Sequence, residues 1–434
     1  MADIRPFKGL RYRLDSPEQL GALVSPPYDM LDAVAIDKLY SAHPYNVIRI
    51  IQNRREPTDA ANRDRHLRAG RLMEQWIRDG VLVRDSEDSL YIYRQRFDHD
   101  AGGGGRVSCE RIGMTALVRL VDFSEGVVFP HEHTLSGPKI DRYELMEATK
   151  ANTELIFGLV SDDGTLYRRI RECVNGNALG RFTDMRGVEH ELYRTIDAAR
   201  IEHLRSMLER RTILIADGHH RYETALTYAR DTGAAGAAYV MMTMVSMADP
   251  GLVIRPFHRV VKKCPLSNKF RSARDLARYF NLSDCGEASM RQVHDFMSGR
   301  LAFKMLFVDA ANRRAWGLTI NAEGGRYIAE HGGGMSPQWN ALAVSEINRL
   351  CVEAIMEQPA DGTVLHEVFE YMDNAEAALA RTQESGCTGC FFIRPLSIAS
   401  IKEVVSAGER MPQKSTNFFP KLFSGLVFNT LDGR

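Results

Sequence analysis

The segment 213–230 restricts the fold of this chain more than any other stretch of its sequence. Four apolar residues, Ile213-Leu214-Ile215-Ala216, precede Asp217-Gly218, and Ala225, Leu226 and Ala229 then recur at helical spacing. A short apolar run that ends in glycine predicts a buried strand followed by a tight turn, and the spacing after it predicts a helix over about 220–230. A helix expected over 197–210 and a strand expected over 238–245 complete an α–β–α–β unit. The predicted fold class is therefore mixed α/β, with further α+β regions.

Helices and strands are also expected on both sides of this unit. Apolar periodicity predicts helices over 60–79, 342–360, 375–384 and 398–407, and two more between 262 and 302. It predicts strands over 89–97, 112–121, 303–308, 315–320, 326–329, 368–372 and 391–393, and a short strand at 46–50. Gly102–Gly105 is expected to form a hairpin connection, and Cys387 and Cys390 are expected in a loop.

The chain length suggests several folding units. At roughly 150 residues per domain, 434 residues correspond to about two to four units. We expect an N-terminal α+β region over 1–160, an α/β core over 161–260, a small α+β unit over 261–340 and a C-terminal α/β region over 341–434.

The composition excludes several classes of protein. The chain has 56 basic and 56 acidic residues, whereas a protein held on DNA by counterion release usually has a basic excess. No apolar run approaches the 18 residues of a membrane span, and the N-terminus lacks the apolar run of a signal peptide, so we expect a cytoplasmic protein. Seven scattered cysteines are a poor disulfide framework.

The turn at Gly218 has the composition of an anion-binding site. A helix that begins there offers free N–H groups and the positive end of its dipole. Arg221 adds a guanidinium suited to phosphate, and His219 and His220 add hydrogen-bond donors or a proton shuttle. We therefore predict phosphate binding by Gly218, His219, His220 and Arg221, with Asp217 and His220 as candidate catalytic groups.

A second group of charged residues lies at 131–152. His131 and His133 could bind a metal ion next to Glu132, but the H-E-x-x-H signature is missing and the sequence shows no third ligand. We therefore expect no metal held by the protein alone. In the alternative interpretation Glu132 is a general base. The candidate substrate contacts are His131, Lys139, Asp141, Arg142 and Asn152.

Two further segments contain candidate residues. Lys414, Ser415 and Thr416 offer a charge and two hydroxyls for phosphate, followed by Lys421. Phe418, Phe419 and Phe423 are expected to pack this tail onto a domain. In the N-terminal region, Asp29 or Arg49 could line a cleft.

In their order along the chain, the motifs resemble the bacterial and archaeal family catalogued as domain of unknown function 1015. The resemblance rests on segments 6–12, 26–29, 46–50, 131–134, 139–142, 150–152, 217–221 and 411–416. Two features depart from the family pattern: Arg255-Pro256-Phe257-His258 stands where Leu-Pro-Thr-His is usual, and the glycine run 102–105 is individual to this chain. The Gly-His-His-Arg turn is also similar to the phosphate-contacting turn of the ParB/sulfiredoxin superfamily, which implies such a core at 161–260.

These resemblances imply a function. They point to a phosphotransferase with free L-serine as candidate acceptor and pyrophosphate or a nucleotide as donor, assisted by Mg²⁺. Glu132 is then the first candidate base and Asp217 the second. His219 stands where sulfiredoxins have their catalytic cysteine, so sulfinic-acid repair is not expected. The alternatives are a nucleotide-binding regulatory protein, a metal-dependent hydrolase using His131, His133, His219 and His220, and a DNA-binding partition factor. The expected partners are small phosphate compounds rather than nucleic acid or membranes, and the oligomeric state stays open.

Overall fold

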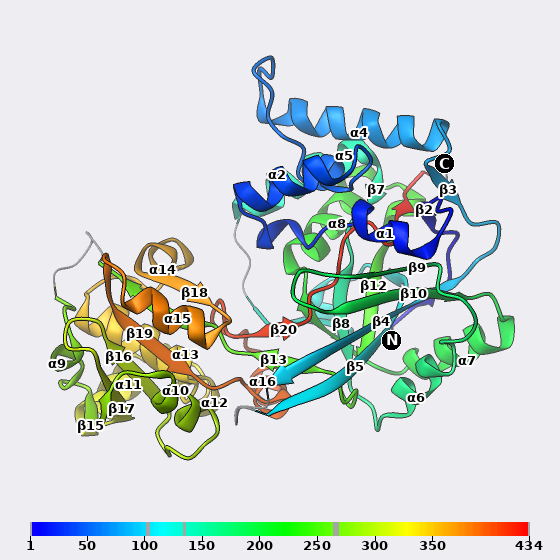
Figure 1. Cartoon of the computed structure of the whole chain (residues 1–434). Helices are drawn as coiled ribbons and strands as arrows, with labels where there is room; N and C mark the ends of the chain where they lie inside the picture. Colours follow the sequence, from blue (N-terminus) through cyan, green and yellow to red (C-terminus); the bar gives the residue numbers. More distant parts are fainter. Residues whose placement is uncertain (1, 101–104, 133–135, 264–268, 433–434) are drawn as a thin grey trace.

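The computed structural model describes residues 2–100, 105–132, 136–263 and 269–432 of the chain. Figure 1 shows two lobes side by side. The large lobe is built on a nine-stranded sheet, and the small lobe on a six-stranded sheet. The mixed α/β class predicted from the sequence is confirmed.

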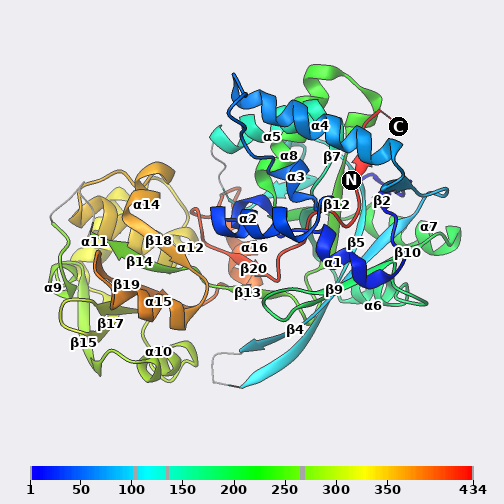
Figure 2. The same ribbon diagram turned by 45° about the horizontal axis from the view of Figure 1, so that its top comes forward.

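The large sheet is mixed, with strand order β6-β11-β8-β12-β5-β4-β10-β9, and β1 pairs with β5. Its strands are β1 (Ile4–Arg5), β4 (Leu90–Asp100), β5 (Arg106–Arg119), β6 (Val128–Pro130), β8 (Ile156–Val160), β9 (Gly180–Thr183), β10 (Glu189–Thr195), β11 (Ile213–Asp217) and β12 (Tyr239–Ser246). β8 is buried along its whole length, as expected of a central strand with apolar side chains on both faces. β4 and β5 form a long antiparallel pair that extends beyond the rest of the lobe in Figure 2.

Two strand pairs in this sheet are parallel, and one of them determines where the site lies. β6 runs parallel to β11, with Ile215 opposite Pro130. The residues that follow both strands therefore leave the sheet at the same edge. His131 and Glu132 follow β6, and Gly218 follows β11, so residues about 85 positions apart in sequence become neighbours.

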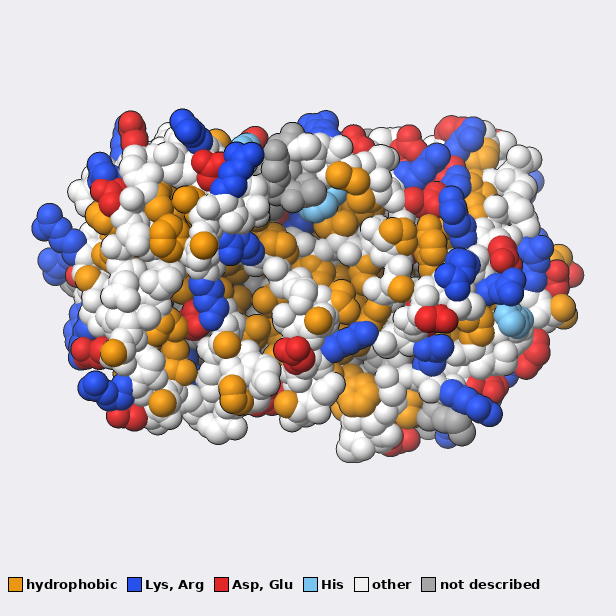
Figure 3. Space-filling model, turned by 90° about the horizontal axis from the view of Figure 1, so that it is seen from below, with side chains coloured by type: hydrophobic (Ala, Val, Ile, Leu, Met, Phe, Trp, Pro, Cys, Tyr) orange, Lys and Arg blue, Asp and Glu red, His pale blue; other side chains and the backbone are white. Residues whose placement is uncertain are grey.

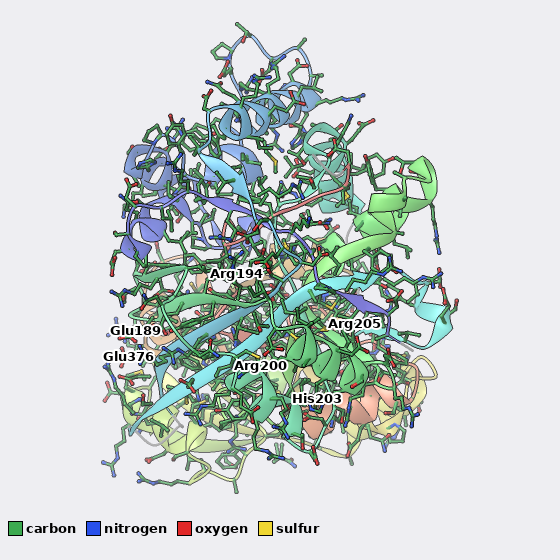
Figure 4. All side chains as sticks on the ribbon, turned by 90° about the vertical axis from the view of Figure 1, so that its right-hand side faces the viewer. Glu189, Arg194, Arg200, His203, Arg205 and Glu376 are labelled. Atoms are coloured by element: carbon green, nitrogen blue, oxygen red, sulfur yellow. The ribbon has the colours of Figure 1, made fainter. Side chains whose placement is uncertain are left out.

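Helices cover both faces of the large sheet. On one side, α5 (Ser136–Thr149) packs against both α4 (Asn62–Arg78) and α8 (His219–Thr232). On the other side, α7 (Ala198–Leu208) packs against α6 (Thr165–Arg171) and β1, and its buried Ile201, Leu204 and Leu208 belong to the core between helices and sheet. Figure 4 shows Arg200, His203 and Arg205 along α7; His203 is exposed, and the Arg205 side chain reaches the carbonyl of Ile4.

The small lobe has an antiparallel sheet in the order β15-β17-β16-β19-β14-β18. Its strands are β14 (His258–Lys262), β15 (Phe280–Glu287), β16 (Met305–Asp309), β17 (Arg314–Ile320), β18 (Phe369–Met372) and β19 (Cys387–Ile393). The helices of this part of the chain are α9 (Ala273–Leu276), α10 (Met290–Met297), α11 (Ala322–His331), α12 (Pro337–Asn340), α13 (Ala343–Glu346), α14 (Gly362–Val368), α15 (Ala375–Thr382), α16 (Ile398–Ser406) and a π-helix over Ile347–Ile355.

The two helices expected between 262 and 302 are present as α9 and α10, and strand β15 lies between them. Three local predictions are wrong. The strand expected over 326–329 lies inside α11, because Asn321 caps that helix by accepting a hydrogen bond from Gly324 N–H. The strand expected at 46–50 is replaced by the short helix α3 (Ile48–Ile51). Cys387 and Cys390 lie in the fully buried β19 rather than in a loop, because two neighbouring strands pair with it. Of the four glycines expected in the hairpin connection, Gly102, Gly103 and Gly104 lie outside the described residues.

The C-terminal tail, residues 411–431, is buried in the core of the large lobe. Its β20 (Asn417–Phe419) pairs with β13 (Val253–Arg255), and its β21 (Asn429–Thr430) pairs with β7 (Ala151–Asn152). Phe418 is fully buried and Phe419 and Phe423 nearly so, which confirms that these rings pack the tail onto the body of the protein.

Two buried polar side chains of the large sheet fix the tail. The guanidinium of Arg111 donates to the carbonyls of Phe419, at 3.1 Å, and Pro420. It also donates to Gln95, whose amide in turn donates to the carbonyl of Lys421 at 2.9 Å. Arg111 is 1% exposed, so bulk water cannot replace its guanidinium as the hydrogen-bond donor to these acceptors.

β20 lies between the two lobes (Figure 1). Seen from below, hydrophobic side chains gather in the hollowed middle of the molecule, and charged side chains are more frequent toward both ends (Figure 3).

Both large sheets combine strands from more than one of the four units expected from the sequence. The nine-stranded sheet has strands on both sides of residue 160, and the six-stranded sheet has strands on both sides of residue 340. The division into four folding units stays a prediction. In the described part of the chain, no helix is both long and apolar enough to cross a membrane.

Replacing Arg111 tests how much the tail depends on this anchor. We expect Arg111→Met to lower the free energy of unfolding by about 3 kcal/mol, because two carbonyls and the Gln95 amide oxygen lose their donor while buried. Urea denaturation measures the change. Arg106→Met, an exposed position on the same strand, should change stability by less than about 0.5 kcal/mol. Equal stability of the two variants would contradict the anchoring role.

Candidate functional site

Residues from six separate segments line one pocket between the lobes. The pocket has a volume of about 240 Å³. Its lining consists of Tyr28, Asp29, His131, Glu132, Ala216, Asp217, Gly218, His219, His220, Arg221, Phe257, His366, Gln413, Lys414, Thr416 and Lys421. Three of these segments are the charged motifs singled out in the sequence, and the structure brings them together.

The edge formed by β6 and β11 provides the floor of the pocket. His131 Nδ1 lies 2.5 Å from the carbonyl oxygen of Ile215, so the two strand ends are joined by a side chain as well as by sheet pairing. The tail extends this edge, because the Met411 N–H donates to the His131 carbonyl at 2.6 Å. Glu132 is thereby held between β6 and the tail.

Gly218 shapes the turn between β11 and α8. Its φ of 89° is in the left-handed region, which glycine adopts without the steric cost of a side chain. A Cβ at this position would also lie 3.0 Å from Arg221 Nε. The glycine thus lets the Arg221 side chain fold back over the turn, where its guanidinium donates to the Leu155 carbonyl and to Asp217 Oδ2, the latter at 3.2 Å.

Glu132 accepts hydrogen bonds from the tail through one of its oxygens. Its Oε1 lies 3.2 Å from Ser415 N, 3.3 Å from Thr416 N and 3.3 Å from Thr416 Oγ1. Burial alone would raise the pKa of Glu132, but the hydrogen bond and charge of His131, with Lys414 nearby, lower it to about 2. The carboxyl group is therefore ionised throughout the neutral range.

His219 lines the pocket as a neutral ring. Its Nε2 accepts a hydrogen bond from the His131 backbone N–H at 3.2 Å, so in this geometry Nε2 carries no hydrogen and Nδ1 does. Burial, reinforced by the neighbouring His131, lowers the pKa of His219 to about 3. Burial also lowers the pKa of the half-buried His220. Both rings therefore line the pocket without adding a positive charge near neutral pH.

Asp217 organises two of the cations. Its Oδ1 lies 3.5 Å from Lys421 Nζ, and its Oδ2 contacts Arg221. Burial opposes ionisation, but these two positive charges hold the pKa of Asp217 far below its usual range. The carboxylate therefore fixes Lys421 and Arg221 at the pocket wall.

The small lobe and the segments that join it to the large lobe close the other side of the pocket. Phe257 comes from the connection between β13 and β14, and His366 from α14. Lys414, whose backbone φ is 57°, places its ammonium 5.4 Å from the centre of the Phe257 ring. Its carbonyl accepts from Arg259 of β14 at 3.0 Å, so backbone and side chain of this residue both contact the segment that begins the small lobe.

The pocket contains balanced charge rather than a basic excess. Arg221, Lys414 and Lys421 stand against the carboxylates of Asp29, Glu132 and Asp217. Asp29, at the exposed end of the lining, and Glu132 are the two carboxylates that are not engaged by Arg221 and Lys421. They are also the residues that could contribute oxygen ligands to a divalent cation.

Several residues predicted to contact substrate lie outside the pocket lining. Arg142 donates to Glu154, Asp141 and the Ile51 carbonyl, and its guanidinium lies 4.0 Å from the ring centre of Tyr28. Arg142 therefore packs against Tyr28, a lining residue, without lining the pocket itself. Lys139 pairs with Glu223.

Three other predicted residues hold the structure together. Asp141 binds Arg65 and His66 as well as Arg142. Asn152 accepts from Met241 N–H at 3.2 Å and from the Asn429 amide at 3.1 Å. The Ser415 hydroxyl donates to the Pro412 carbonyl and so holds the turn.

Sequence reasoning missed Tyr28, Phe257, His366 and Gln413 as lining residues. Tyr28 and Gln413 lie inside the segments 26–29 and 411–416, but neither was named as a candidate there. Phe257 and His366 lie outside the charged motifs, and only the arrangement of the lobes identifies them. Asp29, beside its two prolines, and Lys421, after the Lys-Ser-Thr segment, are sequence candidates that do line the pocket. Among the described residues, no group of three His, Cys, Asp or Glu side chains could hold a metal ion; His133 lies outside them.

The neutral state of His219 makes stability depend on pH. The folded-state pKa of about 3 lies below the value of about 6.5 for an unfolded chain, so the unfolded state binds the proton first as pH falls. This residue should therefore contribute stability above pH 6.5 that is lost toward pH 3, at up to about 1.4 kcal/mol per pH unit. We expect His219→Gln to reduce the slope of unfolding free energy between pH 6 and pH 4.5, measured by urea denaturation. The exposed His203→Gln on α7 is the control; an equal effect there would contradict the assignment.

Comparisons with known proteins agree with the motif pattern at the level of the family. The profile of the family described as "protein of unknown function (DUF1015)" matches residues 4–381. No curated protein matches the chain.

Three solved structures are similar at low identity. A conserved hypothetical protein from Pyrococcus furiosus is 12% identical, with a TM-score of 0.34, over 68% of this chain and 90% of that one. A free serine kinase in complex with AMP is 13% identical, with a TM-score of 0.34, over 67% of this chain and 83% of that one. SbnI from Staphylococcus aureus, truncated at its C-terminus, is 13% identical, with a TM-score of 0.34, over 72% and 86%. Since the family profile spans most of the sequence, the chain belongs to the DUF1015 family of proteins of unknown function.

Proposed function

We propose that this protein is a small-molecule phosphotransferase whose active site is the pocket between the lobes. The observation that carries the proposal is the meeting of the α8 N-terminus, two lysines and an ionised carboxylate in one cavity of about 240 Å³. Phosphoryl transfer needs positions that stabilise spread negative charge, together with a carboxylate that accepts the hydroxyl proton. The pocket supplies both within a space suited to small molecules.

The phosphate groups bind at the start of α8. The first N–H groups of a helix have no partner inside it, and the helix dipole favours an anion there. Lys421 and Lys414 add charge from the tail, and His219 and His220 add neutral donors. Arg221 contributes its positive charge rather than a bidentate hydrogen bond to phosphate, because its guanidinium already donates to the Leu155 carbonyl and to Asp217.

Glu132 receives the hydroxyl proton of the acceptor. Asp217 is the weaker candidate, because each of its oxygens contacts a cation. A carboxylate with a pKa of about 2 is a weak base, but the loose transition state of phosphoryl transfer requires little deprotonation before the phosphorus–oxygen bond breaks. Glu132 therefore orients the hydroxyl by accepting its hydrogen bond and takes the proton late.

Mg²⁺ fits the charge balance of the pocket. Three cations face three carboxylates, so a phosphate donor with several negative charges needs a further counterion. Mg²⁺ is typically bound through one or two carboxylates together with substrate phosphates, and Asp29 and Glu132 are the residues that would hold it. When bound, the ion would neutralise charge on the donor's phosphates.

The proposal also names candidate substrates. Free L-serine is the candidate acceptor, and pyrophosphate or a nucleotide the candidate donor. The test is incubation of the purified protein with serine, Mg²⁺ and pyrophosphate, ATP or ADP, followed by ³¹P NMR for phosphoserine. Absence of product with every donor, together with absence of phosphate binding, would overturn the proposal. Tight nucleotide binding without turnover would instead support a regulatory nucleotide-binding protein.

Removing the charge of Glu132 separates catalysis from binding. We expect Glu132→Gln to lower kcat at least about 100-fold, because the amide cannot accept the hydroxyl proton. Affinity for the donor without Mg²⁺, measured by calorimetry, should change by less than about threefold, since the amide oxygen can still accept the hydrogen bonds of Ser415 and Thr416. The exposed Glu87→Gln should behave as wild type. Normal turnover in Glu132→Gln would exclude Glu132 as the base.

Removing the charge of Lys421 tests the anion site directly. We expect Lys421→Met to weaken pyrophosphate binding about tenfold, which corresponds to one lost charge-assisted hydrogen bond of about 1.4 kcal/mol. Isothermal titration calorimetry measures the affinity. Lys402→Met is the matched control, because Lys402 lies on α16 outside the pocket lining and donates to Ser161 Oγ. An unchanged affinity in Lys421→Met would place the anion elsewhere.

A further inference from the structure

The buried side chain of Arg259, on β14, links the small lobe to the C-terminal tail. Its Nη1 donates to the Phe257 carbonyl at 2.8 Å, and its Nη2 donates to the Lys414 carbonyl at 3.0 Å. Arg259 is 1% exposed, so both hydrogen bonds are shielded from bulk water. One guanidinium therefore holds the backbone of two residues that line the pocket and lie far apart in the sequence.

The same two residues also contact each other through their side chains. The Lys414 ammonium lies 5.4 Å from the centre of the Phe257 ring, which is within the range of a cation–π contact. Arg259, Phe257 and Lys414 thus form a closed set in which each residue contacts the other two. We call these three residues the Arg259 clip.

Lys414 has an unfavourable backbone conformation. Its φ of 57° is in the left-handed region, where a residue with a Cβ is crowded by its own backbone. A residue other than glycine keeps such a conformation where its surroundings hold it. The hydrogen bond from Arg259 to the Lys414 carbonyl is one restraint, and the hydrogen bond from Ser415 N–H to Glu132 is another. The Arg259 clip thus helps to fix the place of the Lys414 ammonium at the pocket.

The charge of Arg259 is buried without full compensation. Moving a guanidinium out of water is unfavourable unless partners satisfy its donors and balance its charge. Arg259 Nε is buried without a hydrogen-bond partner among the described residues, and Glu132 of the pocket is one of the acidic groups that act on its charge. Apolar side chains of similar volume are often at least as stable in such places. We therefore attribute the arginine to its two carbonyl contacts rather than to stability.

We infer that Arg259 is a positioning residue through which the small lobe regulates the phosphate site of the large lobe. β14 belongs to the six-stranded sheet of the small lobe, whereas Lys414 belongs to the tail that is buried in the large lobe (Figure 1). A movement of the small lobe therefore moves or releases Lys414. Because such coupling is reciprocal, an anion bound by Lys414 also strengthens the link between the lobes. This consequence rests on the proposed function, which takes Lys414 as a phosphate ligand.

A double-mutant cycle tests the coupling without any assay of turnover. We expect Arg259→Lys to weaken pyrophosphate binding about tenfold in isothermal titration calorimetry, because an ammonium cannot hold two carbonyls in the geometry of a guanidinium. Lys414→Met should also weaken binding about tenfold. The double variant should bind no more weakly than Lys414→Met alone, because Arg259 acts through Lys414. A double variant about 100-fold weaker than the wild type, or full affinity in Arg259→Lys, would overturn the inference.

Arg394→Lys is the matched control for an effect on stability alone. Arg394 also lies in the small lobe, and its guanidinium donates to two backbone carbonyls, those of Phe296 and Leu301, outside the pocket lining. We expect this variant to lose stability in urea denaturation but to bind pyrophosphate as the wild type does. Equal weakening of binding by Arg394→Lys would show that the effect of Arg259→Lys is structural and would contradict positioning.

An NMR spectrum of the free protein tests the Arg259 clip even if pyrophosphate does not bind. Reductive ¹³C-methylation keeps the charge of each lysine and gives it an NMR signal. We expect the Lys414 signal, assigned by its loss in Lys414→Met, to be shifted upfield by the Phe257 ring and to lose that shift in both Phe257→Leu and Arg259→Lys. An unshifted Lys414 signal in the wild type would overturn the inference, and this outcome needs no variant of Arg259 that folds. Absence of pyrophosphate binding in the wild type would refute the phosphate site of the proposed function, and the spectrum then decides the Arg259 clip by itself.

Discussion

The parallel pairing of β6 with β11 is the interaction on which the rest of the site depends. It places the residues that follow both strands at one edge of the sheet, with Ile215 opposite Pro130. From this edge β6 continues into His131 and Glu132, and β11 continues through Gly218 into α8. A carboxylate and a helix N-terminus therefore lie next to each other, an arrangement known from ligand sites at the carboxyl ends of parallel strands.

The C-terminal tail adds further lining residues to the pocket at this sheet edge. Its backbone N–H groups hold one oxygen of Glu132, and Lys414 and Lys421 reach the pocket from either side of β20. The tail can do so because Arg111 and Gln95 satisfy its carbonyls inside the core. The anchors that hold the tail in the core of the large lobe therefore also place its pocket residues. The charge of the pocket is balanced in part because the Asp217 carboxylate pairs with two of its cations, Arg221 and Lys421.

Local sequence patterns predicted individual elements well where one physical factor dominates. The apolar run 213–216 and the glycine after it correctly indicated β11 and the start of α8. Prediction failed where strand pairing or a helix cap outweighed local propensity, as in β19 and α11. Charged motifs identified Glu132, Asp217, His219 and Lys414 as candidates. The same criterion selected Asp141 and Asn152, which the structure uses in internal networks.

The sequence by itself determined the mixed α/β class, the family, and the glycine turn that opens α8, because strand burial, turn geometry and motif order are local properties of the chain. Only the tertiary structure decided which motifs meet. Residues 132, 217 and 416 are far apart along the chain, and their meeting depends on parallel pairing and on burial of the tail.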